Sequence, residues 1–150
     1  MFSTYQDKEI DEPIDEVWNR IKNFHDFSWA PDVITSLDVV GDVDGESVGA
    51  KRVLNGAFCE TLIELDHNAH LIKYSIDDGP TPVSKDEVFG YRGTIKLTPV
   101  DNGEKTHIEW SSAWDSNKSD AVSFCSNIYT ALLNQLDESF HHEQKVSHAG

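Results

Sequence analysis

"SNKSDAVSFCSNIYTALLNQLDESFHHEQK", residues 116–145, is the stretch that decides the fold of this chain. Apolar side chains recur in it at the three-to-four-residue spacing of a helix, and no proline or glycine interrupts them. The stripe consists of Ala121, Phe124, Cys125, Ile128, Leu132, Leu136 and Phe140. This spacing puts the stripe on one face, so the stretch predicts one long amphipathic helix. We expect residues 146–150 to form a frayed tail.

Segments with the composition and alternation of β-strands precede this helix, and turn residues separate them. Alternation is clearest at residues 88–100, where Tyr91, Gly93 and Ile95 share one face. The predicted strands are residues 2–11, 34–41, 48–55, 57–66, 71–77, 88–100 and 106–114. An antiparallel sheet with one apolar face needs a cover, and the long helix has the length and the stripe to provide it.

Two short helices are predicted between the first and second strands. Residues 12–24 carry Pro13 at the start, acidic residues in the first turn and apolar residues at helical spacing. Residues 25–33, "HDFSWAPDV", are predicted as a second short helix or an ordered loop. The fold class is therefore α+β: a curved seven-stranded antiparallel sheet around a long C-terminal helix, with two short N-terminal helices.

Composition narrows the possible partners. The 150 residues predict one domain, residues 1–150, and a formal net charge of −15 disfavours nucleic acids and anionic membranes. No basic, apolar leader and no run of about 20 apolar residues is visible, so we expect a cytoplasmic protein without membrane insertion. The two cysteines are expected to be unpaired thiols. The seven histidines form no ligand pattern and no phosphate-binding loop is visible, so we expect neither a metal nor a cofactor.

The order of several short motifs carries a resemblance to a known family. The motifs are "EPIDEVWNRIKNF", "WAPDV", "VGAKRV", "ETLIELD", "YSIDDGPTPV", "YRGTIKLTPV" and "IEWSSAW". With the long helix, they resemble the START and pollen-allergen-like (SRPBCC) superfamily, within it the polyketide cyclase/dehydrase group. The resemblance implies a helix-grip fold with a cavity between the sheet and the long helix. Members include ligand carriers, hormone receptors, aromatic cyclases and the plant lachrymatory-factor synthases, so the family indicates fold better than function.

The resemblance also implies site residues. The synthases use an arginine in a "GxxR" strand and a glutamate that opens an "ExLxxxD" strand, which match Arg52 in "GAKR" and Glu60 in "ETLIELD". Tyr91, in "YRGTI", matches a position where that family places an aromatic hydroxyl facing the cavity.

The turn at Asn55-Gly56 decides whether Arg52 and Glu60 share a face. A two-residue type I′ loop would pair Arg52 with Cys59, and the two charged side chains would lie on opposite faces. A three-residue loop over residues 54–56 with a bulge would pair Arg52 with Phe58 and place both charges on one face. We favour the second arrangement, because the resemblance places both residues inside. The alternatives to a functional pair are an ion pair at the surface, or an Arg–Glu pair that only closes the cavity.

Two functions of different classes follow. The first is a module that binds a small apolar or aromatic molecule, or a lipid, in the internal cavity. The second is a cofactor-independent cyclase, dehydratase or isomerase in which Glu60 is the acid/base and Arg52 stabilises negative charge. The predicted ligand-binding residues are Phe58, Leu62, Tyr91, Gly93, Trp110, Ser112, Ile128 and Leu132. A protein-interaction module has no specific motif behind it, and the sequence does not indicate an oligomeric state.

Overall fold

The computed structural model describes the backbone of residues 1–149 and the side chains of residues 1–141. The strands are β1 (Phe2–Ile10), β2 (Leu37–Val40), β3 (Lys51–Leu54), β4 (Phe58–Asp66), β5 (Leu71–Asp78), β6 (Phe89–Val100) and β7 (Lys105–Asp115). The helices are α1 (Ile14–Ile21), the 3-10 turn η1 (Asp101–Gly103) and α2 (Asp120–Ala149). Of the predicted frayed tail, residues 146–149 belong to α2 and residue 150 lies outside the described residues; the fraying itself stays a prediction.

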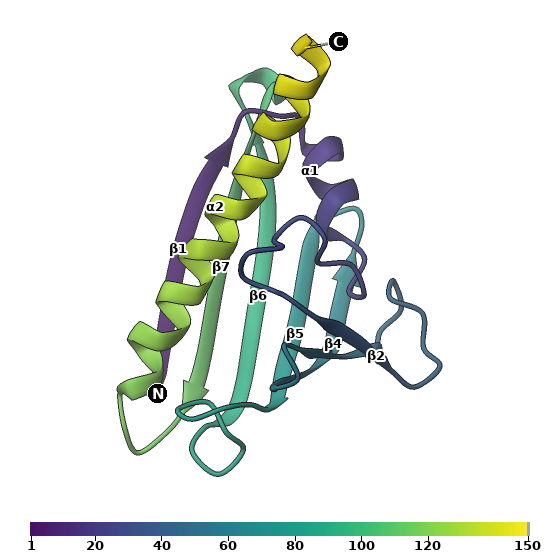
Figure 1. Ribbon diagram of the computed structural model, residues 1–150. Helices are drawn as coiled ribbons and strands as arrows, with labels where there is room; N and C mark the ends of the chain where they lie inside the picture. Colours follow the sequence, from purple (N-terminus) through teal and green to yellow (C-terminus); the bar gives the residue numbers. More distant parts are fainter. Residues whose placement is uncertain (150) are drawn as a thin grey trace.

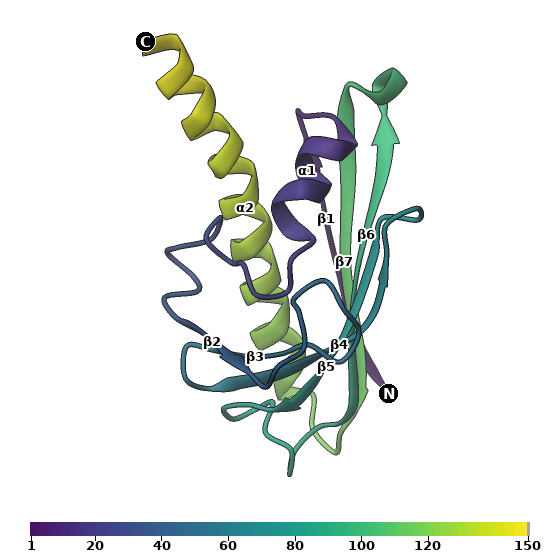
Figure 2. The same cartoon turned by 90° about the vertical axis from the view of Figure 1, so that its right-hand side faces the viewer.

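The seven strands form one antiparallel sheet in the order β1-β7-β6-β5-β4-β3-β2. The pairing of β4 with β5 shifts register between Cys59 and Glu60 and again between Leu62 and Glu64. Such bulges bend a strand and increase its twist. In Figure 2, β2 and β3 accordingly run almost crosswise to β6 and β7, so the sheet has a concave face.

Helix α2 lies along the concave face, as Figure 1 shows, and α1 packs near one end of the sheet. The buried residues of α2 include five of the predicted stripe, Ala121, Cys125, Leu132, Leu136 and Phe140, together with Tyr129 and Leu133. The other two stripe residues, Phe124 and Ile128, are half-buried. The prediction of a seven-stranded sheet covered by a long C-terminal helix is confirmed.

The prediction of a second short N-terminal helix is wrong, and residues 25–33 form the ordered loop that was the other possibility. After α1 the chain makes successive turns, with Ala30 N donating to Phe27 O (3.0 Å) and Ile34 N to Ala30 O (2.9 Å). Asp26 Oδ1 also accepts a bond from Ser28 N at 2.9 Å, which favours a turn over a helix here. Pro31 then lacks the N–H that a continuing helix would need. We call residues 25–36 the aromatic loop, because Phe27 and Trp29 anchor it with rings 4.8 Å apart.

Candidate functional site

Arg52 and Glu60 are cross-strand neighbours in the hairpin of β3 and β4. The register pairs Arg52 with Glu60 and Leu54 with Phe58, so both charged side chains lie on one face. Neither register predicted for this turn is right. The loop has three residues, as in the favoured arrangement, but they are Asn55, Gly56 and Ala57 instead of residues 54–56, so Arg52 pairs with Glu60 and not with Phe58. The prediction that the two charged side chains share a face still holds.

The side chain of Asn55 explains the position of the loop. Asn55 and Gly56 have φ values of 54° and 63°, and Ala57 N donates to Leu54 O at 2.9 Å, as in a tight turn. However, Asn55 Oδ1 also accepts bonds from Thr35 N (2.8 Å) and Ser36 N (3.3 Å), and its Nδ2 donates to Val33 O (3.0 Å). The turn is thus fixed to the aromatic loop, a long-range contact that local turn rules do not include.

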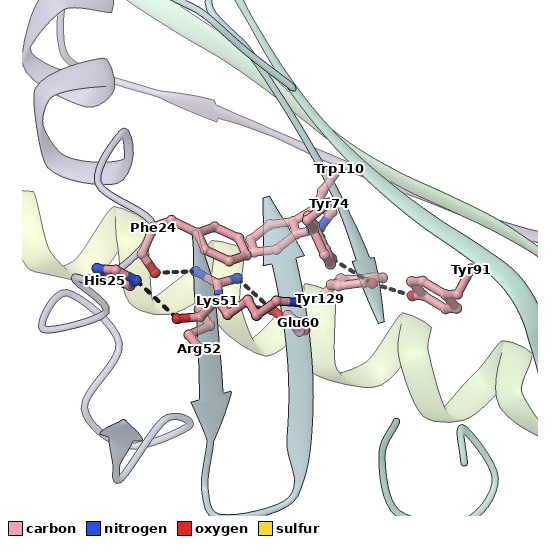
Figure 3. Close-up of polar contacts among 9 residues, drawn as sticks. All are labelled: Phe24, His25, Lys51, Arg52, Glu60, Tyr74, Tyr91, Trp110 and Tyr129. Carbon is pink, nitrogen blue, oxygen red and sulfur yellow. Dashed lines mark hydrogen bonds and ion pairs between the residues drawn. The ribbon is translucent and has the colours of Figure 1, made fainter. Parts of the chain in front are cut away.

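The Arg52–Glu60 pair is buried on the concave face (Figure 3). Arg52 Nε and Nη2 both donate to Glu60 Oε1, at 2.9 and 2.6 Å, and Arg52 Nη1 donates to Phe24 O at 2.9 Å. The guanidinium carbon lies 3.7 Å from the ring centroid of Phe24 and 4.7 Å from that of Phe27. Each side chain keeps only 7% of its surface exposed, so this is an ion pair largely removed from water.

Glu60 is held by one oxygen only. Both bonds from Arg52 reach Oε1, and none of the described residues donates a hydrogen bond to Oε2. Burial raises the pKa of the Glu60 carboxyl above its ordinary value of 4.5, and the neighbouring guanidinium opposes that rise. The site therefore contains a largely buried carboxylate whose Oε2 has no hydrogen-bond partner in the described part of the chain.

Three tyrosine hydroxyls form a chain beside this pair. Trp110 Nε1 donates to the Tyr74 hydroxyl at 3.0 Å, and Tyr74 donates to the Tyr129 hydroxyl at 2.7 Å. The Tyr129 hydroxyl in turn bonds that of Tyr91. Burial is the main cause that raises the pKa of all three phenols well above 10, so they stay protonated at neutral pH.

A hollow of about 40 Å³ lies between the sheet and α2, next to Glu60. Its lining comprises Phe27, Ile34, Arg52, Leu54, Phe58, Glu60, Tyr74, Ile76, Trp110, Cys125, Ile128, Tyr129 and Leu132. This volume suits about one water molecule and is far below the several hundred Å³ of a typical ligand site. The interior is thus closed around a small space rather than open around a ready cavity.

The predicted site residues divide into two groups. Arg52, Glu60, Phe58, Trp110, Ile128 and Leu132 line the hollow, whereas Leu62, Tyr91, Gly93 and Ser112 do not. Tyr91 reaches the site through its contacts with the lining residues Tyr129 and Cys125, and Ser112 bonds Thr4 at 2.6 Å. Gly93 lies against the Tyr74 ring, which a Cβ at residue 93 would overlap.

Seven lining residues were not predicted as site residues: Phe27, Ile34, Leu54, Tyr74, Ile76, Cys125 and Tyr129. Tyr74 lies two residues from both Ile72 and Ile76 in β5, so the three side chains share one face of the strand. The inward direction of Tyr74 could therefore have been found from the strand period. Tyr129 lies four residues after Cys125 and belongs to the same helical face. Phe27 and Ile34 carried no such signal, since they lie in the irregular aromatic loop.

A second, outer groove of about 820 Å³ lies between the aromatic loop and α2. Trp29 lines this groove as well as a smaller hollow of about 20 Å³ beneath it. The groove is lined mainly by polar and charged side chains, among them Arg20, Asp32 and Glu138.

Other features of the described residues restrict the chemistry. Cys59 and Cys125 are free thiols, as predicted. Among the side chains that the structure describes, no three histidine, cysteine, aspartate or glutamate residues lie together as a metal site would require. No helix in the described range has the length and apolar content of a membrane span.

Comparison with known proteins agrees with this architecture. A solved structure of a protein from Nitrosospira multiformis is 43% identical, with 96% of this chain and 99% of that chain covered at a TM-score of 0.92. A solution structure from Thermobifida fusca is 23% identical, covers 95% of both chains and has a TM-score of 0.79. Norcoclaurine synthase from Thalictrum flavum, solved with dopamine and hydroxybenzaldehyde, is 16% identical, with 94% and 87% covered and a TM-score of 0.73. The search of curated proteins gave no match.

The last two likenesses concern the fold alone. The family evidence is a match over residues 1–140 to the family described as polyketide cyclase / dehydrase and lipid transport. This match spans all seven strands and most of α2, and the 43% identical structure covers nearly the same range. The chain therefore belongs to the polyketide cyclase / dehydrase and lipid transport family, within the SRPBCC-type fold.

Proposed function

We propose that this protein binds a small, mainly apolar or aromatic molecule between the sheet and α2, next to Glu60. The observation that carries the proposal is the buried Arg52–Glu60 pair beside an otherwise apolar hollow. Removing two charges from water costs several kcal/mol per ion, and apolar residues of similar volume would often stabilise a fold more. A pair placed there is therefore better explained by recognition of a ligand than by stability.

Binding requires the interior to open, because about 40 Å³ cannot hold an aromatic ring system. Four lining side chains are only half-buried: Ile34, Phe58, Ile76 and Ile128. They come from the aromatic loop, β4, β5 and α2, and they mark the side where the hollow comes nearest to solvent. Displacement of these side chains would enlarge the hollow without breaking a strand pairing.

The experiment uses N-phenyl-1-naphthylamine, a neutral probe whose fluorescence rises in apolar sites. The wild-type protein should bind it saturably with one site per chain. Ile128→Trp fills the margin of the hollow and should weaken binding about tenfold or more. Thr130→Trp adds the same ring on the exposed face of α2 and should leave affinity unchanged. Circular dichroism of both variants checks that they fold, and equal binding by both would refute the proposed site.

A cofactor-independent enzyme remains the second candidate, favoured by one observation. Burial raises the pKa of Glu60, and its Oε2 is free of hydrogen bonds from the described residues, as suits a general acid or base. Arg52 fits the role of anion stabiliser less well, because its nitrogens already donate to protein oxygens. Mass spectrometry of a bound ligand before and after incubation tests this; a product formed by wild type but not by Glu60→Gln would favour the enzyme.

A further inference from the structure

We propose that the site selects ligands that donate a hydrogen bond, such as phenols, alcohols and amines, and discriminates against carboxylates and other anions. This inference rests on the proposed function and names the ligand class for that same site. The argument is an inventory of the polar groups around the hollow: each of the others already has at least one protein partner, whereas Glu60 Oε2, an acceptor, has none among the described residues.

Arg52 offers little to an incoming anion. Each of its three nitrogens donates once to a protein oxygen, Nε and Nη2 to Glu60 and Nη1 to the carbonyl of Phe24, which uses three of its five N–H groups. The aromatic rings of Phe24, Phe27 and Tyr74 surround the guanidinium, with ring centroids 3.7, 4.7 and 5.9 Å from its central carbon. The positive charge is thus matched to Glu60 and screened from the hollow by rings.

The tyrosine and tryptophan groups are also occupied. Trp110 N–H donates to Tyr74, and Tyr74 O–H donates to Tyr129. Because Tyr129 accepts from Tyr74, its own proton is available for its bond with Tyr91. The remaining polar group of the lining, the Cys125 thiol, interacts with the Tyr91 hydroxyl. These donors therefore satisfy one another within the protein.

Glu60 Oε2 is what remains. It belongs to a side chain that is 93% buried and lines the hollow, and no described residue donates to it. An ionised carboxylate accepts hydrogen bonds and donates none, so a ligand satisfies Oε2 only by bringing a donor. A ligand carboxylate would instead place a second negative charge beside Glu60, in a chain whose formal net charge is already −15.

Three naphthalenes of similar size test this at pH 7.5: 2-naphthol, which donates; 2-methoxynaphthalene, which only accepts; and 2-naphthoate, which is anionic. Their dissociation constants are measured by displacement of N-phenyl-1-naphthylamine. We expect 2-naphthol to bind about tenfold or more tightly than 2-methoxynaphthalene, as for one hydrogen bond to a charged group. The 2-naphthoate ion should bind weakest.

Glu60→Gln provides the sharper comparison. With its amide oxygen held by Arg52, the glutamine would present its NH₂ to the ligand, so 2-naphthol should lose its advantage and 2-naphthoate should gain. Asp77→Asn is the matched control, because Asp77 is exposed, does not line the hollow and lies close enough to affect the Glu60 carboxyl. It removes the same charge and should leave the wild-type ranking unchanged.

The outcomes separate the two proposals. If the probe does not bind the wild-type protein, the proposed function fails. If the probe binds but 2-naphthoate or 2-methoxynaphthalene equals or exceeds 2-naphthol, the inference on ligand class fails while the binding site stands. The wild-type ranking decides the matter even if Glu60→Gln does not fold. A ranking that Asp77→Asn reverses as strongly as Glu60→Gln would show a long-range charge effect and overturn the assignment to Oε2.

Discussion

At the scale of single residues, the buried pair makes the clearest prediction on stability. Arg52→Met leaves Glu60 buried without its counter-charge, and breaking such a pair costs about 3–5 kcal/mol. The double variant Arg52→Met/Glu60→Leu removes both charges and should recover most of that loss. Urea unfolding at pH 8 measures both changes. A single variant within about 1 kcal/mol of wild type, or a double variant no better than the single, would contradict a desolvated ion pair.

The raised pKa of Glu60 makes the free energy of unfolding depend on pH, and the direction of the shift fixes the sign of that dependence. The folded protein holds the Glu60 proton more tightly than the unfolded chain, so the stability contributed by this group is present below its ordinary pKa of 4.5. That contribution is lost as pH rises through the higher folded value. The free energy of unfolding of wild type minus that of Glu60→Gln should therefore fall as pH rises above 4.5 and then level off. A difference that grows with pH would mean that Arg52 outweighs burial.

The charged pair also shows what sequence reasoning reaches at this scale. The resemblance identified Arg52 and Glu60, and the structure places them on one face. Both predicted registers failed, because Asn55 bonds Val33, Thr35 and Ser36 far back in the chain. A turn rule that considers only neighbouring residues does not include this competition.

At the scale of elements, the close packing of β6 against β5 makes a further prediction. Gly93 in β6 pairs with Tyr74 in β5, and a Cβ at residue 93 would overlap the Tyr74 ring. The Tyr74 side chain is buried and its hydroxyl is hydrogen-bonded to Trp110 and Tyr129, so moving the ring aside would strain these contacts. Gly93→Ala should lower the free energy of unfolding by about 1–3 kcal/mol.

The neighbouring strand position supplies the control for this prediction. Thr94 is half-buried in the same strand, and Thr94→Ala should have the smaller effect. Denaturant unfolding compares the two variants, and near-ultraviolet circular dichroism reports displacement of the aromatic rings. Equal stability and an unchanged aromatic spectrum for Gly93→Ala would show that Tyr74 moves freely.

Elements with a strong period were predictable and irregular ones were not. Strand β6 and helix α2 follow from alternation and from the stripe that includes Cys125 and Leu136, because these patterns bury one face of a regular element. The aromatic loop has no period, and its turns depend on bonds such as that from Ser28 N to Asp26. Its contributions to the site, Phe27 and Ile34, were therefore missed.

At the scale of the whole molecule, the order of strands and helices fixed the architecture but not the interior volume. The bulges near Glu60 and Leu62 curve the sheet around α2 and create the concave face. How much of that space stays empty depends on how Tyr74, Tyr129 and Phe27 pack inside it, and their side-chain directions depend on the assembled structure. The cavity that the resemblance implies is accordingly a hollow of about 40 Å³.

The central claim is that this interior opens to admit a small aromatic molecule next to Glu60. A crystal structure of the protein with 2-naphthol tests it most directly. The account predicts the naphthalene ring between the sheet and α2, its hydroxyl about 2.5–2.7 Å from Glu60 Oε2, and Ile128 or Phe58 displaced. A structure with 2-naphthol only in the outer groove, or with the interior still closed around Tyr74 and Arg52, would contradict it.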